Sequence, residues 1–402
     1  MTTQPNLLRS LSLAEISLYG IGTILGAGIY VLLGNVIGIS GPMTPWAFLL
    51  AAVIVCFSAY SYAQMSRRFP RSAGEAAYVQ EGLRSRALAA AAGYAIAMGG
   101  IVSAATLSRG VSGYFNVIAS WPSALPIILL VGLLTGAAAW GVKQSVGLAI
   151  LTTGLEMAGL LLAAVVSGDE LLEANIHWRE LMPLPTPEYF PGIVGGAFLA
   201  FYAFIGFEDM VNMAEEVENP QRNLPLGIAI AVIATTLLYL ITATVALHTL
   251  PIEDMAGSDA PLALIIERNS KIPPDIMAVI GVVAIINGAL IQIIMVSRVL
   301  YGMAQQQLAP ALLGRVNATS RTPLQATLLT GGLVLFFALW LPVTTLANAT
   351  SSLILIVFTL VNLSLLFLNY NQGRKGPIQL GLPAIGALLC CGFLILQFWS
   401  TQ

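Results

Sequence analysis

GIGTILGAG, residues 20–28, interrupts the first long apolar segment of the chain with four glycines in nine positions. Glycines on one face would let this helix pack closely against a neighbour, and Gly22 and Gly26 have the spacing that such packing needs. Successive residues of a helix are about 100° apart, however, so the four glycines point in different directions. Glycine all around a helix is typical of a local break, where it tolerates unusual backbone angles. The stretch therefore favours a broken helix.

A second interruption occurs at Gly206–Glu216, with the sequence GFEDMVNMAEE. Two adjacent carboxylates, Glu208 and Asp209, are costly inside an apolar span unless they face water or protein. The helix could instead end at Gly206 and leave these residues in a solvated loop. Residues 191–205 number only 15, however, which is too few to cross a hydrocarbon core of about 30 Å at about 1.5 Å per residue. We expect the helix to resume beyond Gly206, with a second break near the membrane midplane.

The amino-acid composition of the whole chain predicts a membrane protein. Of 402 residues, 57% are hydrophobic and only 9% are charged, whereas about 25% are charged in a soluble domain. The sequence predicts an all-α membrane protein with about eleven transmembrane helices, at residues 13–36, 44–66, 87–119, 124–142, 146–167, 192–214, 225–249, 274–305, 324–341, 346–369 and 378–399.

Basic residues in the connections predict the orientation. With a cytoplasmic N-terminus, twelve of the 17 Lys and Arg residues lie inside, three lie outside (Arg179, Arg268 and Lys271) and two lie within spans. We therefore expect a multi-pass protein of the plasma membrane. An odd number of spans places its C-terminus outside.

Four stretches resemble the amino acid–polyamine–organocation superfamily of transporters. They are GIGTILGAGIYVLL at residues 20–33, RFPRSAGEAAY at 68–78, FYAFIGFEDMVNMAEEVENPQRNLPL at 201–226 and SRVLYGMA at 297–304. The resemblance implies two inverted repeats of five spans, here 13–167 and 192–369, in one transport domain, with residues 378–399 as an extra helix. It also implies a substrate site between broken helices one and six. Relatives commonly have twelve spans, whereas this chain is expected to have eleven.

A broken helix offers complementary groups to both charges of an amino acid. Free N–H groups at Gly26, Ala27 and Gly28 would bind the carboxylate, and carbonyls at Ile24 and around Tyr202–Ile205, Ala203 included, would bind the ammonium. The resemblance makes Tyr202 a lid over the substrate, although tyrosine is also common at membrane interfaces. Comparison of helices adds Gln292, Met98 and Ile101 to the side-chain pocket, the last two being equally well explained as ordinary core. This mostly apolar wall with one amide suggests a neutral amino acid.

Glu156 is the most informative charge within a span. Many relatives carry a lysine near the middle of helix five, where this chain has Glu156, about ten residues into the span. A carboxyl group at that depth could carry a proton or bind a cation such as sodium. It could also be a structural group that is hydrogen-bonded to a neighbouring helix. Glu208 is the second candidate for coupling.

The sequence thus predicts a secondary active transporter that moves a neutral amino acid with protons by alternating access, and not an enzyme. An amine or polyamine carrier and an amino acid exchanger remain alternatives. Cys56, Cys390, Cys391 and two isolated histidines suggest no metal site and no cofactor, and no ATP-binding loop is present. A net charge of −2 suggests no nucleic-acid partner. A channel or a membrane sensor is disfavoured, because the chain has neither a repeated filter segment nor a soluble output domain.

Overall fold

Long helices joined by short connections form the chain. The computed structural model describes residues 11–26, 28–70, 74–119, 121–140, 146–173, 182–214, 216–317, 320 and 322–400. The helices are α1 (Leu13–Leu25), α2 (Gly28–Ser40), η1 (Gly41–Met43), α3 (Thr44–Arg68), α4 (Gly74–Leu83), α5 (Arg86–Ile118), α6 (Ala124–Trp140), α7 (Val146–Glu173), η2 (Pro187–Tyr189), α9 (Phe190–Ala203), η3 (Phe207–Met213), α10 (Pro220–Thr249), α11 (Ile252–Ala256), α12 (Pro261–Asn269), α13 (Pro274–Gln305), η4 (Ala311–Gly314), α14 (Leu324–Trp340), α15 (Val343–Asn371) and α16 (Pro377–Ser400).

Helix length and composition confirm a membrane protein. Within the described residues, eight helices are long and apolar enough to cross a bilayer, and three shorter apolar helices accompany them. Large apolar side chains face outward on these helices, including Leu133 on α6, Leu151 on α7 and Leu388 on α16, which are 66%, 71% and 72% exposed. Such surface suits hydrocarbon rather than water. The chain is therefore a multi-pass membrane protein.

The eleven predicted spans all fall on helices, with the two expected interruptions. The span predicted at 13–36 is divided into α1 and α2, and the span predicted at 192–214 is divided into α9 and η3. The sequence did not predict three further helices. α4 lies in the connection after α3, and α11 and α12 lie in the connection between α10 and α13.

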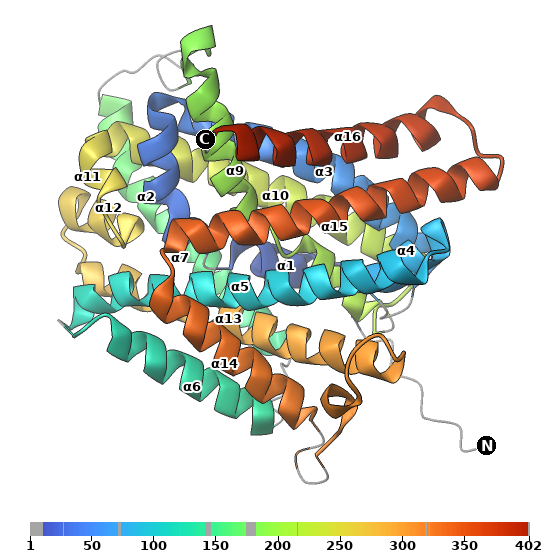
Figure 1. Ribbon diagram of the computed structural model, residues 1–402. Coiled ribbons are helices and arrows are strands. Elements are labelled where there is room, and N and C mark those ends of the chain that lie inside the picture. The colour runs from blue at the N-terminus through green and yellow to red at the C-terminus, as the bar shows by residue number, and fades with distance from the viewer. Residues whose placement is uncertain are drawn as a thin grey trace.

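Helices from the two halves of the chain pack in a reciprocal way. α3 packs against α9 and α10 packs against α1, so the span that follows each broken helix covers the broken helix of the other half. α5 packs along α13, α6 packs along α14, and α3 packs along α10. Two repeats related by a twofold axis in the membrane plane produce this pattern. α16 lies outside it and runs back along α15 (Figure 1).

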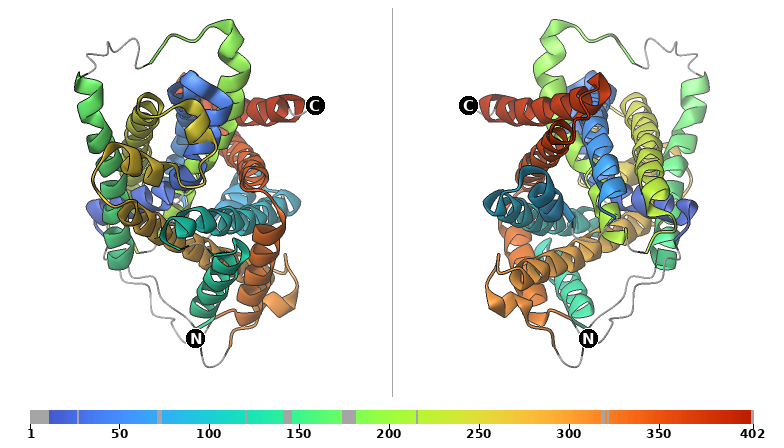
Figure 2. Two further views of the ribbon diagram at one scale, coloured as in Figure 1. Left: turned by 90° about the vertical axis from the view of Figure 1, so that its left-hand side faces the viewer. Right: turned by 90° about the vertical axis from the view of Figure 1, so that its right-hand side faces the viewer.

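The two ends of the helix bundle differ. α11 and α12 cover one end, and the left-hand view of Figure 2 looks onto that end. α11 packs closely against α2, because a Cβ on Gly34 of α2 would lie 2.5 Å from the carbonyl oxygen of Met255. A Cβ on Gly113 of α5 would collide with the carbonyl oxygen of Asp259. α4 lies at the opposite end (Figure 1).

Candidate functional site

The first break lies between α1 and α2. α1 ends at Leu25, the N–H of Gly26 still donates to Gly22 O at 2.9 Å, and α2 begins at Gly28. The two earlier glycines lie inside α1 and serve close packing. A Cβ on Gly20 would collide with the sulfur of Met210, and a Cβ on Gly22 would collide with the hydroxyl of Thr153 on α7. Both explanations of the glycine-rich stretch therefore hold, at different glycines.

The second break follows α9. The chain turns at residues 204–206 and continues as the 3₁₀ helix η3. Gly206 has φ +134°, a conformation that glycine adopts far more readily than other residues. Its N–H donates to the Glu208 carboxylate at 2.8 Å. Glu208 therefore turns back toward the break and ties up a backbone group that the helix leaves free.

The two breaks touch each other. A Cβ on Gly28 would lie 2.9 Å from the Cα of Ala203, and a Cβ on Gly206 would collide with the carbonyl oxygen of Thr23. The Tyr239 hydroxyl of α10 bridges the same backbone segments. It lies 2.9 Å from Ile24 O and 2.8 Å from Ala203 O, and donates its single proton to these two carbonyls.

A small pocket lies between the breaks and helices α5 and α13. Its volume is about 20 Å³, which is room for about one water molecule. The residues that line it are Thr23, Ile24, Gly26, Gly28, Ser103, Leu107, Tyr202, Ile205, Asp209, Gly288, Ile291 and Gln292. The first N–H groups of α2 have no acceptor within their own helix. The pocket thus combines a helix N-terminus, backbone carbonyls and apolar side chains.

Most of the residues predicted from the sequence lie in this pocket or beside it. The members of its wall are Ile24, Gly26, Gly28, Tyr202, Ile205 and Gln292. Ala203 is buried directly behind Gly28. Ala27 lies outside the described residues.

α5 contributes other residues than the two that the sequence suggested. Met98 is 38% exposed and Ile101 is buried in the core, and neither lines the pocket. Ser103 and Leu107 line it instead. The Tyr202 hydroxyl lies 3.1 Å from both the hydroxyl and the backbone carbonyl oxygen of Ser103. Tyr202 is 4% exposed, so it belongs to the pocket wall and not to a membrane interface.

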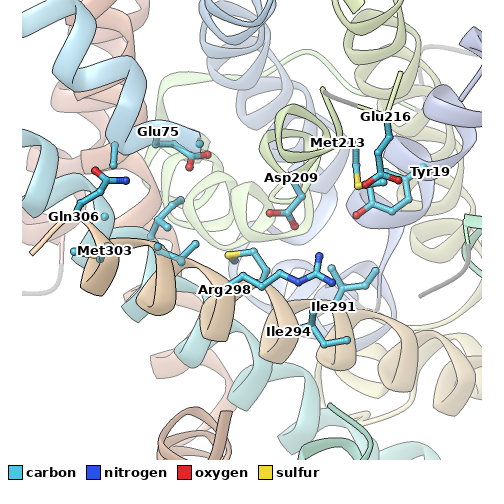
Figure 3. A pocket seen from close by; sticks show the side chains of 17 residues that line it. Tyr19, Glu75, Asp209, Met213, Glu216, Ile291, Ile294, Arg298, Met303 and Gln306 are labelled. Carbon is cyan, nitrogen blue, oxygen red and sulfur yellow. The ribbon is translucent and has the colours of Figure 1, made fainter. Parts of the chain in front are cut away.

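A larger cavity of about 260 Å³, here called the vestibule, adjoins the pocket. Asp209 and Ile291 line both spaces. The vestibule runs between α1, α4, α5, η3 and α13 as far as Gln306, toward the end that carries α4. Its charged side chains are Glu75, Asp209, Glu216 and Arg298 (Figure 3). The pocket therefore adjoins a cavity on the side of the α4 end, whereas α11 and α12 cover the other end.

Glu156 lies close to the pocket without lining it. The side chain is fully buried on α7, and the amide of Asn287 donates to its Oε1 at 3.2 Å. Its Oε2 has no hydrogen-bond partner within the described part of the chain. The hydroxyl of Tyr30 on α2 donates to the Glu156 backbone carbonyl at 2.6 Å. Gly288, the residue after Asn287, lines the pocket.

Three of these contacts were missed by sequence reasoning, namely those of Tyr239, Ser103 and Asn287. Each of these residues is a polar residue inside an otherwise apolar span, which is a usable signal. The sequence nevertheless does not reveal which partner each one meets. No group of three or more metal-ligating side chains occurs among the residues that the structure describes.

Comparison with known proteins gives a consistent result. Residues 11–402 match the family model described as amino acid permease. The chain is 31% identical over 389 residues to cationic amino acid transporter 3, mitochondrial, of Arabidopsis thaliana, covering 90% of this chain but only 63% of that protein. It is 27% identical over 430 residues to the branched-chain amino acid permease BcaP of Bacillus subtilis, covering 99% of this chain and 90% of that one.

A solved structure shares the fold. The crystal structure of MhsT in complex with L-phenylalanine superposes with a TM-score of 0.65, covering 99% of this chain and 100% of that one. Sequence identity is 13%, so the likeness concerns the arrangement of helices alone.

Proposed function

Because the chain belongs to the amino acid permease family, we propose that it is a secondary active transporter that carries amino acids across the membrane by alternating access. Its family is one of transporters and not of enzymes. The observation that carries the proposal is the contact between two broken helices around a pocket that adjoins a larger cavity toward one end of the bundle, while α11 and α12 cover the other end. A carrier needs such a site, which opens to each side in turn.

The substrate backbone would bind at the breaks. Its carboxylate would accept from the N–H groups that begin α2, where the helix dipole favours an anion. Its ammonium would donate to Ile24 O and to carbonyls of residues 202–205. Tyr239 occupies one lone pair of Ile24 O and one of Ala203 O, and a carbonyl oxygen can accept a second bond. The pocket is too small for an amino acid in this conformation, so binding requires the vestibule and the pocket to merge.

The side chain of the substrate would face α5 and α13. Leu107, Ile205 and Ile291 supply apolar wall and Gln292 supplies one amide, which favours a neutral side chain. The name of the branched-chain permease relative agrees with this preference. Asp209 in the same pocket favours a second candidate, a substrate with a basic group, and the name of the Arabidopsis relative agrees with that one.

Glu156 would couple transport to protons. An ionised carboxylate without a cationic partner is expensive in a fully buried position, whereas a protonated one is not. Glu156 touches both halves of the site, because Tyr30 of α2 bonds its backbone and Asn287 of α13 bonds its side chain. A change of its charge would therefore alter how α7 holds α2 and α13. Glu208 is the alternative coupling group, although its side chain bonds the second break.

The predicted orientation places the α4 end in the cytoplasm. In that orientation the N-terminus is cytoplasmic, the C-terminus is outside, and the vestibule faces the cytoplasm. This conformation is then the inward-facing state of a plasma-membrane carrier.

Glu156→Gln tests the coupling, since glutamine imitates the protonated carboxyl. Purified protein in proteoliposomes would be assayed for uptake of a labelled amino acid panel under a pH gradient, and for counterflow without one. One proton moved with a neutral substrate across 100 mV corresponds to about 2.3 kcal/mol, or about 50-fold accumulation. We expect the variant to lose this accumulation and to retain counterflow, because exchange needs no return of an empty, deprotonated carrier.

The matched control is Glu267→Gln, which removes an exposed carboxylate on α12. Accumulation by Glu156→Gln equal to that of the control would exclude Glu156 as the coupling group. If accumulation by the native chain instead follows a sodium gradient, the coupling ion is sodium and not the proton. Counterflow without gradient-driven accumulation in the native chain would identify an exchanger.

A further inference from the structure

Asp209 stands at the boundary between the pocket and the vestibule. It lies in η3, three residues after the glycine of the second break, and it is the only carboxylate that lines both spaces within the described part of the chain. Figure 3 shows its side chain pointing into the vestibule, opposite α13. The residue is 5% exposed, so its charge is largely removed from bulk water.

Its surroundings supply little positive charge. Its side-chain contact is with the amide of Gln292, at 3.4 Å between Nε2 and Oδ2, which is long for an N–H···O bond. Glu75 and Glu208 are close enough to act on it electrostatically, and both are acidic. Arg298 lines the same vestibule, but it forms no ion pair with Asp209. An ionised Asp209 therefore lacks a fixed cation.

A buried carboxylate in such surroundings requires a positive charge from elsewhere. A proton is one source, and a positively charged substrate is the other. Gly28 and Asp209 line the same pocket. Once the pocket and the vestibule merge, an amino acid whose carboxylate rests on the start of α2 can therefore direct its side chain toward Asp209, which lines both spaces.

We infer that Asp209 sets the charge of the cargo: its carboxyl is protonated when a neutral amino acid occupies the pocket, and the basic group of a cationic amino acid takes the place of that proton. This inference rests on the proposed function and extends it to a second substrate class. Both kinds of substrate then enter with the same total charge at Asp209, so one site serves both.

Other groups near Asp209 bear on its pH dependence. The vestibule presents Tyr19 from α1, Glu75 from α4, Glu216 from the segment after η3, and Arg298 from α13. Tyr62 of α3 donates to Glu75 at 3.3 Å, and Glu208 precedes Asp209 in the chain. Burial raises the pKa of Glu75 to about 7, so this group titrates in the range of the experiment and needs its own control.

The experiment measures uptake of leucine and of lysine by reconstituted protein between about pH 5.5 and 8.5. For the native chain we expect the KM for leucine to rise about tenfold across this range, while the KM for lysine does not rise. In Asp209→Asn, lysine should lose at least tenfold in affinity and the KM for leucine should no longer rise with pH, while accumulation stays coupled to protons through Glu156. Asp209→Glu keeps the charge and should restore both the lysine uptake and the pH dependence.

Two controls isolate Asp209. Asp254→Asn removes an exposed carboxylate on α11 and should behave as the native chain. Glu75→Gln should keep the difference between leucine and lysine, because Glu75 does not line the pocket. If Glu75→Gln alone removes the difference, the charge selection belongs to Glu75 and the inference is wrong.

The outcomes separate this inference from the proposed function. Uptake of no amino acid by the native chain would refute the function itself. Leucine uptake that lysine does not inhibit at any pH would leave the function intact and overturn the inference. So would an Asp209→Asn variant that keeps its affinity for lysine and its pH profile. If this variant fails to fold, two other results still test the inference. They are the difference between the pH profiles of leucine and lysine in the native chain, and the retention of that difference in Asp209→Glu.

Discussion

The two breaks perform the same backbone task with different chemistry. At the first, Gly26 bonds back into its own helix, and the continuing helix α2 has no charged side chain in 13 residues. At the second, a carboxylate bonds the N–H of Gly206, and the continuing helix η3 has two acidic residues in its first turn. The first break thus presents unmodified backbone, which suits the carboxylate that all amino acids share. The second adds the charge that can distinguish substrates and bind protons.

The difference is informative because the two halves of the chain pack reciprocally. α10 covers α1 in the way that α3 covers α9, yet the reciprocal arrangement does not extend to the charges. Glu75, Glu208 and Asp209 all gather on the side of the second break. The backbone arrangement therefore follows the repeat, and the ionisable groups depart from it.

The largest expected effect comes from Gly206→Ala. Gly206 has φ +134°, and its added Cβ would collide with the carbonyl oxygen of Thr23. The backbone conformation alone costs a non-glycine residue about 1–3 kcal/mol, and the collision would push the two breaks apart. We expect the variant to lose transport completely in proteoliposome uptake assays.

Gly26→Ala is the matched substitution at the first break. Its nearest obstacle would be Thr23 O at 3.3 Å, which a small adjustment relieves. We expect measurable uptake from this variant when both are compared at equal amounts of monodisperse protein. If the two variants lose activity equally, the second break is not the more constrained one.

Hydropathy and glycine placement were enough to predict the spans and both breaks. Apolar length is a local property of the sequence, and so is the inability of residues 191–205 to cross the bilayer. The faces of α5 were not predictable in the same way. Met98 and Ser103 are five residues apart, and packing against α13 and the contact of Ser103 with Tyr202 on α9 determine which of them meets the pocket.

Long-range polar partners were also beyond prediction. Glu156 was identified as a buried charge, but Asn287 lies 131 residues later, and nothing local to either residue links them. Tyr239 is separated from Ile24 by 215 residues. Such pairs depend on how the repeats dock, and a single sequence does not encode that in a readable pattern.

Glu75→Gln tests whether charge is concentrated around the second break. Burial raises the pKa of Glu75 from 4.5 to about 7, while its bond from Tyr62 acts in the opposite direction. Since the folded pKa is the higher one, the stability that this group contributes is fully present below about pH 4.5 and is lost as pH rises to about 7.

The substitution should therefore stabilise the protein at high pH only. The full effect at pH 8 is at most about 3 kcal/mol, from 1.36 kcal/mol for each pH unit by which the pKa is raised. Thermal unfolding in detergent would measure it. We expect the Tm of the variant to exceed that of the native chain by a few degrees at pH 8 and to equal it near pH 4.5. An equal difference at both pH values would mean that the substitution acts through packing.

Tyr239→Phe has the smallest expected effect and the most direct bearing on how the breaks are joined. The substitution removes one hydroxyl that donates to both Ile24 O and Ala203 O and leaves the ring between Phe48 and Phe204. A hydrogen bond of this kind contributes about 0.5–1.5 kcal/mol, and two buried carbonyls that lose a donor raise the cost somewhat. We expect the Tm to fall by a few degrees at every pH, in contrast to the pH-dependent change at Glu75. We also expect the substrate KM to rise by about threefold to tenfold, because the carbonyls that would hold the ammonium are no longer fixed. Thr236→Val on the same helix is the matched control, since its hydroxyl bonds only Val232 O within α10. If Tyr239→Phe changes the KM no more than this control does, the two breaks are held together by packing alone and the bridge contributes nothing to binding.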